Sequence, residues 1–228
     1  MYGPRTCPFI PALKLEASVV VTSKGRLNLN TQEHWESIYA SKGDWDLSWI
    51  QREPRMSLSL IGEVCPAGRV IDLGAGTSFL AERLLDRGYS ITVLDISQTA
   101  IDRARNRLGA RASQIHWIVA DVTAQTHLGS FDAWHDRAVF HFLTNPAGRA
   151  AYTALLARTV PAGGHAVLAT FALDGPEKCS GLEVRRYNGQ MLAGELGPQF
   201  DLLKSVPELH VTPWGAQQSF QYSLFSRI

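Results

Sequence analysis

Residues 70–84, VIDLGAGTSFLAERL, contain the pattern that decides the fold. A short apolar run ends at Leu73, and apolar side chains then recur at helical spacing from Phe79. Gly74 and Gly76 lie between the two patterns, where glycine allows a tight turn and a close approach of the backbone to a ligand. The stretch therefore predicts a buried strand, a glycine loop and a helix, in that order.

The same alternation of patterns continues along the chain. Apolar runs typical of strands occur at residues 69–74, 90–95, 115–121, 131–136 and 164–172. Helical patterns follow most of them, with Ser97 and Pro146 as helix starts. This alternation predicts βαβ units, hence a parallel sheet with helices on both faces. Residues 200–212 and 219–228 predict two more strands joined by a polar loop, so we expect an antiparallel pair at one edge.

The bulk properties narrow the class of protein. The chain has 228 residues and a net charge of +1, with 45% hydrophobic and 19% charged residues. Such a balance is ordinary for a globular protein and argues against nucleic-acid or membrane partners. No apolar run approaches the roughly 20 residues of a membrane span. Cys7, Cys65 and Cys179 form no metal-ligand spacing, so we expect no metal site and a reducing, cytoplasmic location.

Residues 1–29 differ from the rest of the chain. They contain three prolines and several basic residues, with Glu16 as their one acid. Proline opposes the amphipathic helix of a transit peptide, and the apolar runs are too short for a secretory signal. We therefore expect an irregular extension at 1–29 and a single domain at 30–228, as a monomer or homodimer.

The residues around the glycine loop also distinguish a dinucleotide cofactor from a cationic one. Asp95 follows Gly76 by 19 residues at the end of the second strand, where an acid meets ribose hydroxyls. A dinucleotide loop would have a third glycine at position 79, which is Phe79 here. Asp72, two residues before Gly74, is a poor neighbour for a diphosphate and a good partner for a cation. S-adenosylmethionine (SAM) carries both an ammonium and a sulfonium.

With these features the chain resembles the class I SAM-dependent methyltransferases. DLGAG at 72–76, Asp95 and VADV at 119–122 are similar to the first three signature motifs of that family. The resemblance implies a Rossmann-like sheet of seven strands, mostly parallel with an antiparallel edge. It implies that Asp72 lies near the amino acid end of SAM, that Asp95 holds the ribose, and that Asp121 accepts from the adenine amino group. The full set of implied cofactor residues is Asp72, Gly74, Gly76, Thr77, Asp95, Ile96, Asp121 and Val122.

A narrower resemblance covers residues 30–228. HWESIYA and WDLSWIQ, WHDRAVFHFLT, and ATFALDGPEKCSGLEVRRYN resemble a subfamily of bacterial methyltransferases and the mitochondrial citrate synthase lysine methyltransferase. The likeness divides the domain into a helical lid region (30–66), a SAM-binding core (67–171), and an acceptor loop with C-terminal strands (172–228).

Three tryptophans precede the predicted sheet. Trp35 lies on the apolar face of an amphipathic helix, and we interpret it as packing on the sheet. Trp45 and Trp49 lie in KGDWDLSW, a polar stretch less typical of a core. In similar methyltransferases an N-terminal segment folds over the cofactor, so we expect Trp45 or Trp49 to close the SAM site, with simple packing as the alternative.

Polar residues follow the fourth strand in HDRAVFHFL, residues 135–143. Buried charges are costly unless paired, so His135, Asp136, Arg137 and His141 are the catalytic candidates beside the methyl group. A helix starting after Asp136 would place Arg137 and His141 on one face. His141 could take a proton from the acceptor and Arg137 could favour an anion. Pairing of Asp136 with Arg137 or His135 is the structural alternative.

The loop after the fifth strand supplies the acceptor candidates Lys178, Cys179, Arg186 and Tyr187. Cys179 is at most a lining residue, since methyl transfer from SAM needs no covalent enzyme intermediate. The basic residues of these loops favour a small anionic acceptor, above all a thiol. A protein lysine is the second hypothesis, with Asp136 and Tyr187 around the amine. A non-catalytic SAM-binding module and a nicotinamide enzyme are the third, and Asp72 and Phe79 disfavour the latter.

Overall fold

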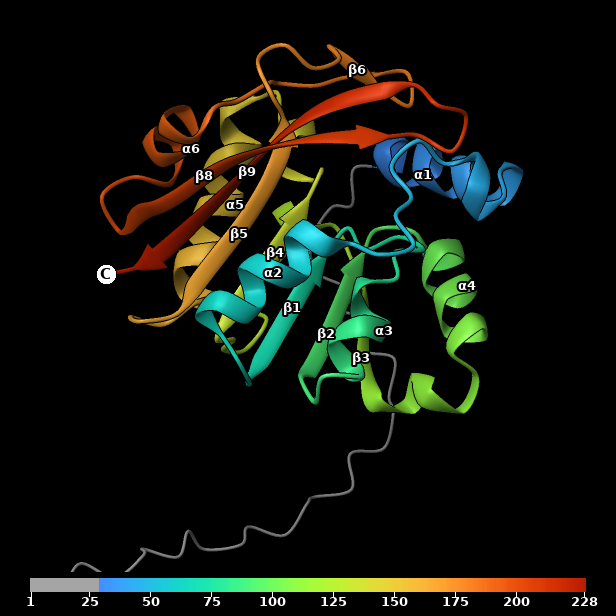
Figure 1. The fold of residues 1–228 in the computed structure, drawn as a ribbon, viewed down its shortest axis with the longest axis horizontal. Helices are drawn as coiled ribbons and strands as arrows, with labels where there is room; N and C mark the ends of the chain where they lie inside the picture. Colours follow the sequence, from blue (N-terminus) through green and yellow to red (C-terminus); the bar gives the residue numbers. More distant parts are fainter. Residues whose placement is uncertain (1–28) are drawn as a thin grey trace, which may run out of the picture.

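The computed structural model describes residues 29–228. The extension expected at 1–29 therefore lies, apart from Leu29, outside the described residues. Figure 1 shows a twisted central sheet flanked by helices, with the N-terminal helix α1 (Leu29–Ser41) near the carboxyl ends of β1 and β2. Between residues 29 and 228, no helix combines the length and the apolar character needed to cross a membrane.

The sheet has seven strands in the order β3-β2-β1-β4-β5-β9-β8. The strands are β1 (Arg69–Leu73), β2 (Ser90–Asp95), β3 (Ile115–Val119), β4 (Ala133–Arg137), β5 (His165–Phe171), β8 (Phe200–Val211) and β9 (Gln217–Arg227). The first five run parallel, β9 runs antiparallel to β5, and β8 runs antiparallel to β9. The predicted parallel sheet with an antiparallel edge is confirmed. The strand order reverses between β1 and β4, so a crevice is expected at their carboxyl ends.

Helices cover both faces of the sheet. After α1 come α2 (Arg55–Val64), α3 (Leu80–Leu85), α4 (Gln98–Leu108), α5 (Pro146–Thr159) and α6 (Gly189–Leu196). Short 3-10 helices are η1 (Asp44–Asp46), η2 (Gly109–Gln114), η3 (Val122–Ala124) and η4 (Phe140–Phe142), and a small hairpin joins β6 (Lys178–Cys179) to β7 (Leu182–Glu183). Ser97 caps α4 as expected, because its hydroxyl accepts from the Ala100 amide at 3.1 Å. Neither α6 nor the hairpin is evident in the sequence pattern of residues 172–198.

The alternation of side chains along β1 builds the two halves of the core. Val70 packs on one face with apolar residues of α2 and α3, including Leu58 and Leu84. Ile71 and Leu73 face the other side, among apolar residues of α5 and α6. Burial on both faces explains the nearly continuous apolar pattern that identified the strand.

Two expected elements differ in their bounds. The helix expected after the glycine loop is limited to α3, because the loop continues to Phe79. The helix expected after Asp136 is absent. β4 continues through Arg137, Ala138 has φ +74°, and η4 follows. Arg137 and His141 therefore do not share a helix face, and that prediction was wrong because a positive φ breaks the path between them.

Candidate cofactor and acceptor site

Two adjoining cavities open at the carboxyl edge of the sheet. The larger spans about 890 Å³ and the smaller about 420 Å³ when the space open to solvent is included. They meet at Trp49, Gly74 and Arg137, which line both. The cavities lie where the strand order predicts the crevice.

The glycine loop between β1 and α3 forms one wall. Gly74 and Gly76 both have φ +54°. A Cβ atom on Gly74 would lie 2.1 Å from Cγ2 of Val139, and one on Gly76 would lie 2.1 Å from Oη of Tyr39. The two glycines are thus required by neighbouring side chains as well as by the turn. Gly74 lines both cavities, whereas Gly76 contributes its amide to Asp95.

Asp95 ends β2 at the larger cavity. One carboxylate oxygen accepts from the Gly76 amide at 2.7 Å and the other from the Ser97 amide at 2.8 Å. Burial raises the pKa of Asp95 to about 6, and these two hydrogen bonds oppose that rise. The neighbouring Ile96 also lines the cavity. The carboxylate is therefore held rigidly at the position where the sequence predicts ribose binding.

Asp121 and Val122 line the same cavity beyond the end of β3. One carboxylate oxygen of Asp121 accepts from the amide and the hydroxyl of Thr123, at 2.8 and 2.7 Å. Thr77, also expected at the cofactor, lines neither cavity. Its side chain is buried and its carbonyl oxygen accepts from Arg107 at 2.9 Å.

A buried hydrogen-bonded chain lies beside the smaller cavity. His135 Nδ1 is 2.6 Å from Asp72 Oδ1, and His135 Nε2 is 2.9 Å from the Ser57 hydroxyl. All three residues line this cavity, and their side chains are almost fully buried. His135, expected beside the acceptor, thus contacts the residue expected at the amino acid end of SAM.

Asp136 points into the core. Its carboxylate accepts from the Val139 and Phe140 amides and from the Tyr152 hydroxyl, at 2.8, 3.0 and 2.5 Å. Burial raises its pKa to about 6. Neither alternative pairing expected from the sequence occurs, since Asp136 binds neither Arg137 nor His135 and lines neither cavity.

Arg137 is fixed at the junction of the two cavities. Its Nε donates to the Tyr222 hydroxyl at 3.0 Å and its Nη1 to the Trp49 carbonyl at 2.8 Å. The guanidinium lies over the Phe220 ring, with 4.4 Å from Cζ to the ring centroid. Nη2 is buried and has no partner among the described residues.

His141 is fully buried behind the cavity wall. Its Nδ1 accepts from the Phe171 amide at 3.3 Å. Burial, and secondarily the charge of Arg137, lower its pKa to about 3, so the ring is neutral. It lines neither cavity. The structure therefore separates His141 from the acceptor position expected for it.

Aromatic side chains wall the rest of the larger cavity. They are Trp35, Tyr39, Trp49, Phe142, Phe171 and Phe220. The Trp35 ring meets Phe142 and Trp49 edge to face, at centroid distances of 5.2 and 5.9 Å. The sequence predicted that Trp35 packs on the sheet, and no sequence motif indicated that the phenylalanines line a site. Only the spacing of Trp35 and Tyr39, one helical turn apart, indicated a shared face.

The loop residues expected to contact the acceptor are dispersed. Cys179 lines the larger cavity, and burial raises its pKa to about 11. Lys178 is exposed and pairs with Glu183, and Arg186 pairs with Glu177. Tyr187 is buried on the face of the sheet that carries α5 and α6. Lys178, Arg186 and Tyr187 line neither cavity.

The two tryptophans proposed for the lid have different positions. Trp49 lines both cavities. Trp45 is 48% exposed, stacks on Phe79 and lines neither cavity. Trp49 therefore remains a candidate for the lid, whereas the structure removes Trp45 from the cavity because its ring packs on the outside of the glycine loop.

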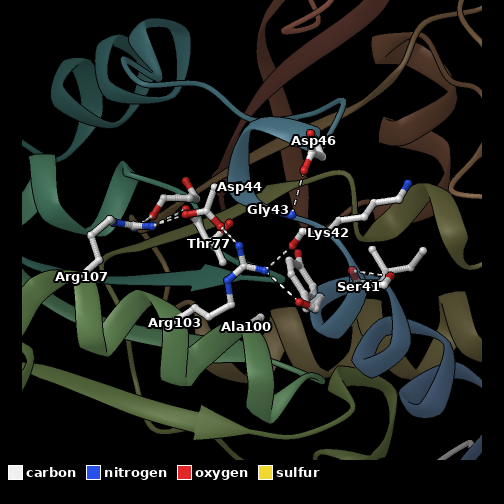
Figure 2. Close-up of polar contacts among 12 residues, drawn as sticks. Ser41, Lys42, Gly43, Asp44, Asp46, Thr77, Ala100, Arg103 and Arg107 are labelled. Carbon is white, nitrogen blue, oxygen red and sulfur yellow. Dashed lines mark hydrogen bonds and ion pairs between the residues drawn. The ribbon is translucent and has the colours of Figure 1, made fainter.

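Polar contacts attach the lid region to the core, as Figure 2 shows. Arg103 of α4 donates to the Tyr39 and Lys42 carbonyls at the end of α1 and pairs with Asp44. Arg107 pairs with Asp44 and donates to the Thr77 carbonyl of the glycine loop. Two arginines on α4 thus join α1 and η1 to the walls of the cavity.

Comparisons with known proteins agree with this geometry. A family model described as a methyltransferase domain matches residues 70–164. An eEF1A lysine and N-terminal methyltransferase from Danio rerio is 27% identical over 151 residues, covering 64% of this chain and 22% of that protein. The chain therefore spans about a fifth of that relative's length. A 2-heptyl-1-hydroxyquinolin-4(1H)-one methyltransferase from Mycobacteroides abscessus is 28% identical over 170 residues, covering 68% of this chain and 74% of that protein.

Solved structures share the fold. One, described as concerning the conversion of a disulfide bond into a thioacetal group during echinomycin biosynthesis, has a TM-score of 0.69 and 23% identity. The match covers 86% of this chain and 92% of that chain. Others with the same fold contain SAM or S-adenosylhomocysteine (SAH).

Proposed function

We propose that the chain is a SAM-dependent methyltransferase that methylates a small apolar molecule at an acidic nucleophile, above all a thiol. The match of residues 70–164 to a methyltransferase domain supports the reaction class. The observation that carries the proposal is the aromatic wall of the larger cavity beyond the cofactor-side carboxylates. Aromatic and aliphatic walls bind flat apolar molecules by burying their surface, and they offer few hydrogen-bond partners to a polar peptide backbone.

The residues of the cavity fit SAM. Asp95 would hold the ribose hydroxyls and Asp121 the adenine amino group. Asp72 has one buried oxygen, Oδ2, without a partner among the described residues, which suits a cationic ligand. When bound, SAM supplies an electrophilic methyl group on a sulfonium. The contribution of the chain is then to align the acceptor with that methyl group and to exclude water.

The titratable groups of the larger cavity provide no free base, which favours an acceptor that ionises without one. Among the described lining residues, these groups are Tyr39, Asp95, Asp121, Arg137 and Cys179. Burial raises the pKa of Tyr39 well above 10 and that of Cys179 to about 11, so neither is a base at neutral pH. Asp95 and Asp121 are engaged on the cofactor side. An ordinary thiol, with a pKa of about 8.5, is partly ionised at neutral pH, whereas an amine at about 10.4 needs help to lose its proton.

A protein lysine is the second candidate acceptor. The zebrafish relative and the faces of Trp35 and Trp49, which suit an ammonium, favour it. The two residues that the sequence suggested around the amine, Asp136 and Tyr187, lie away from the cavity. The thiol is therefore the first choice.

Tritiated SAM and purified protein test both candidates. We expect label in an extractable product when aryl or alkyl thiols are added. With a thiol series, the rate should rise with pH up to the pKa of each thiol, because the acceptor and not the enzyme supplies the ionised form. Asp95→Asn is the control and should abolish labelling. Label confined to a protein band would favour the lysine, and no label with any acceptor or lysate would contradict both.

A further inference from the structure

Two buried atoms of opposite charge, both in residues that line the smaller cavity, have no partner among the described residues. They are Oδ2 of Asp72 and Nη2 of Arg137, and both residues line this cavity. No other buried side-chain atom that lacks a partner belongs to a lining residue of this cavity, within residues 29–228. Leaving such groups unsatisfied costs free energy, so their presence indicates a ligand that supplies the missing partners.

We propose that Arg137 binds the carboxylate of the amino acid end of SAM, while His135 and Ser57 orient Asp72 toward its ammonium. This assignment rests on the proposed function, because it takes SAM as the ligand. In this assignment Arg137 binds the cofactor and not the acceptor. No other Lys or Arg among the described residues lines the larger cavity. An α-amino acid carries one ammonium and one carboxylate, which matches the two unpartnered atoms.

The fixed geometry of Arg137 supports the assignment. Its Nε and Nη1 are held by Tyr222 and by the Trp49 carbonyl, and its plane is held against Phe220. The unpartnered Nη2 is therefore preorganised, and a preorganised guanidinium loses little entropy when it binds a carboxylate. The contact with Trp49 also connects this group to the lid region.

The chain Ser57–His135–Asp72 explains the orientation of the carboxylate. With a proton on Nδ1, His135 donates to Asp72 Oδ1, and its Nε2 lies within hydrogen-bond distance of the Ser57 hydroxyl. One oxygen of Asp72 is then occupied and the other remains available. His135 and Ser57 act through Asp72, so both are positioning residues.

A comparison of two ligands distinguishes binding of the amino acid end by Arg137 from a general role of Arg137 in folding. SAH contains the amino acid, and 5′-methylthioadenosine lacks it, so we measure the Kd of both by calorimetry. Arg137→Met should weaken SAH about 10- to 100-fold, the range for a lost charge-assisted hydrogen bond, and leave methylthioadenosine unchanged. Unchanged methylthioadenosine binding also shows that the variant is folded. Arg105→Met, in the last turn of α4 and lining neither cavity, is the matched control and should alter neither affinity.

His135 is tested by rescue. His135→Leu should weaken SAH selectively, whereas His135→Asn, whose amide can donate in place of Nδ1, should restore much of the affinity. Equal weakening of both ligands, or unchanged SAH affinity in Arg137→Met, would overturn the assignment while leaving the proposed function intact. If the wild-type protein binds neither ligand, the proposed function fails as well.

Discussion

Tyr39 and Gly76 meet where the lid region touches the glycine loop. The Tyr39 hydroxyl occupies the space that a Cβ atom at position 76 would need. Glycine at this position thus meets two separate demands, a positive φ and a close contact with a side chain from another element. Gly76 thereby brings the glycine loop into contact with Tyr39, a residue that lines the larger cavity.

Gly76→Ala should lower the free energy of unfolding by about 1–3 kcal/mol and weaken SAH binding at least several-fold, because Tyr39 must move. Gly88→Ala is the matched control, since Gly88 also has a positive φ but nothing lies within 4 Å of its added Cβ. The control should lose stability but keep its SAH affinity. Denaturant titration and calorimetry measure the two effects, and equal SAH affinity in both variants would contradict the role of the Tyr39 contact.

The buried His141 predicts how the free energy of unfolding depends on pH. Burial lowers its pKa to about 3 in the folded protein, below the ordinary value of about 6.5 in the unfolded chain. Protons therefore bind the unfolded state more tightly, and stability falls as pH falls from 6.5 toward 3. At pH 5 this one group should cost about 2 kcal/mol relative to pH 7.

His141→Gln should remove that loss, because glutamine keeps an acceptor for the Phe171 amide but does not titrate. The difference in unfolding free energy between pH 7 and pH 5 should shrink by about 2 kcal/mol relative to wild type. Exposed His116→Gln is the control and should leave the difference unchanged. An identical pH dependence in wild type and His141→Gln would contradict the buried, neutral ring.

At the scale of elements, α1 is attached to α4 at two points. Glu36 accepts from the Gln98 amide at 2.6 Å and the Thr99 amide at 3.2 Å, at the start of α4. Arg103 binds the carbonyl groups at the end of α1. Each contact satisfies backbone groups that a helix end leaves without partners. The pair fixes the direction of α1, and with it the positions of Trp35 and Tyr39 over the cavity.

Arg103→Met should loosen α1 without unfolding the sheet. We expect faster amide hydrogen exchange over residues 31–47 and an SAH affinity lower by about 10-fold, as for the loss of charge-assisted hydrogen bonds. Arg105→Met on the same helix is the control, since its side chain makes no ion pair with the described part of the chain. Exchange that accelerates equally in β1 and α1 would indicate global destabilisation instead.

At the scale of the whole molecule, the site joins distant parts of the chain. α1 provides Trp35, the carboxyl ends of β2 and β3 provide Asp95 and Asp121, and β9 provides Phe220. The antiparallel pairing of β5 with β9 brings Phe220 opposite Phe171, so β9 completes the aromatic wall of the larger cavity. A ligand in this cavity contacts segments that are together only in the folded state.

SAH should therefore stabilise the whole fold. At a concentration of 100 times its Kd it should add about 2.7 kcal/mol, which raises the Tm of a chain of this size by roughly 5–10 °C. Hydrogen exchange should slow in both α1 and β9. Asp95→Ala is the control and should show no shift at the same SAH concentration. A wild-type Tm that does not respond to SAH would contradict the cofactor assignment.

The sequence by itself determined the parallel sheet, its antiparallel edge and the positions of Asp95 and Asp121 at strand ends. Those features follow from local periodicity and from the fixed place of strand ends in a βαβ unit, which neighbouring residues encode. The tertiary structure decided which polar side chains reach the cavity. Asp136, His141 and Tyr187 are turned into the core, because hydrogen-bond partners or apolar neighbours far away in the chain hold them there. The aromatic wall likewise exists only after α1 and β9 pack together, since no local pattern specifies contacts between opposite ends of a chain.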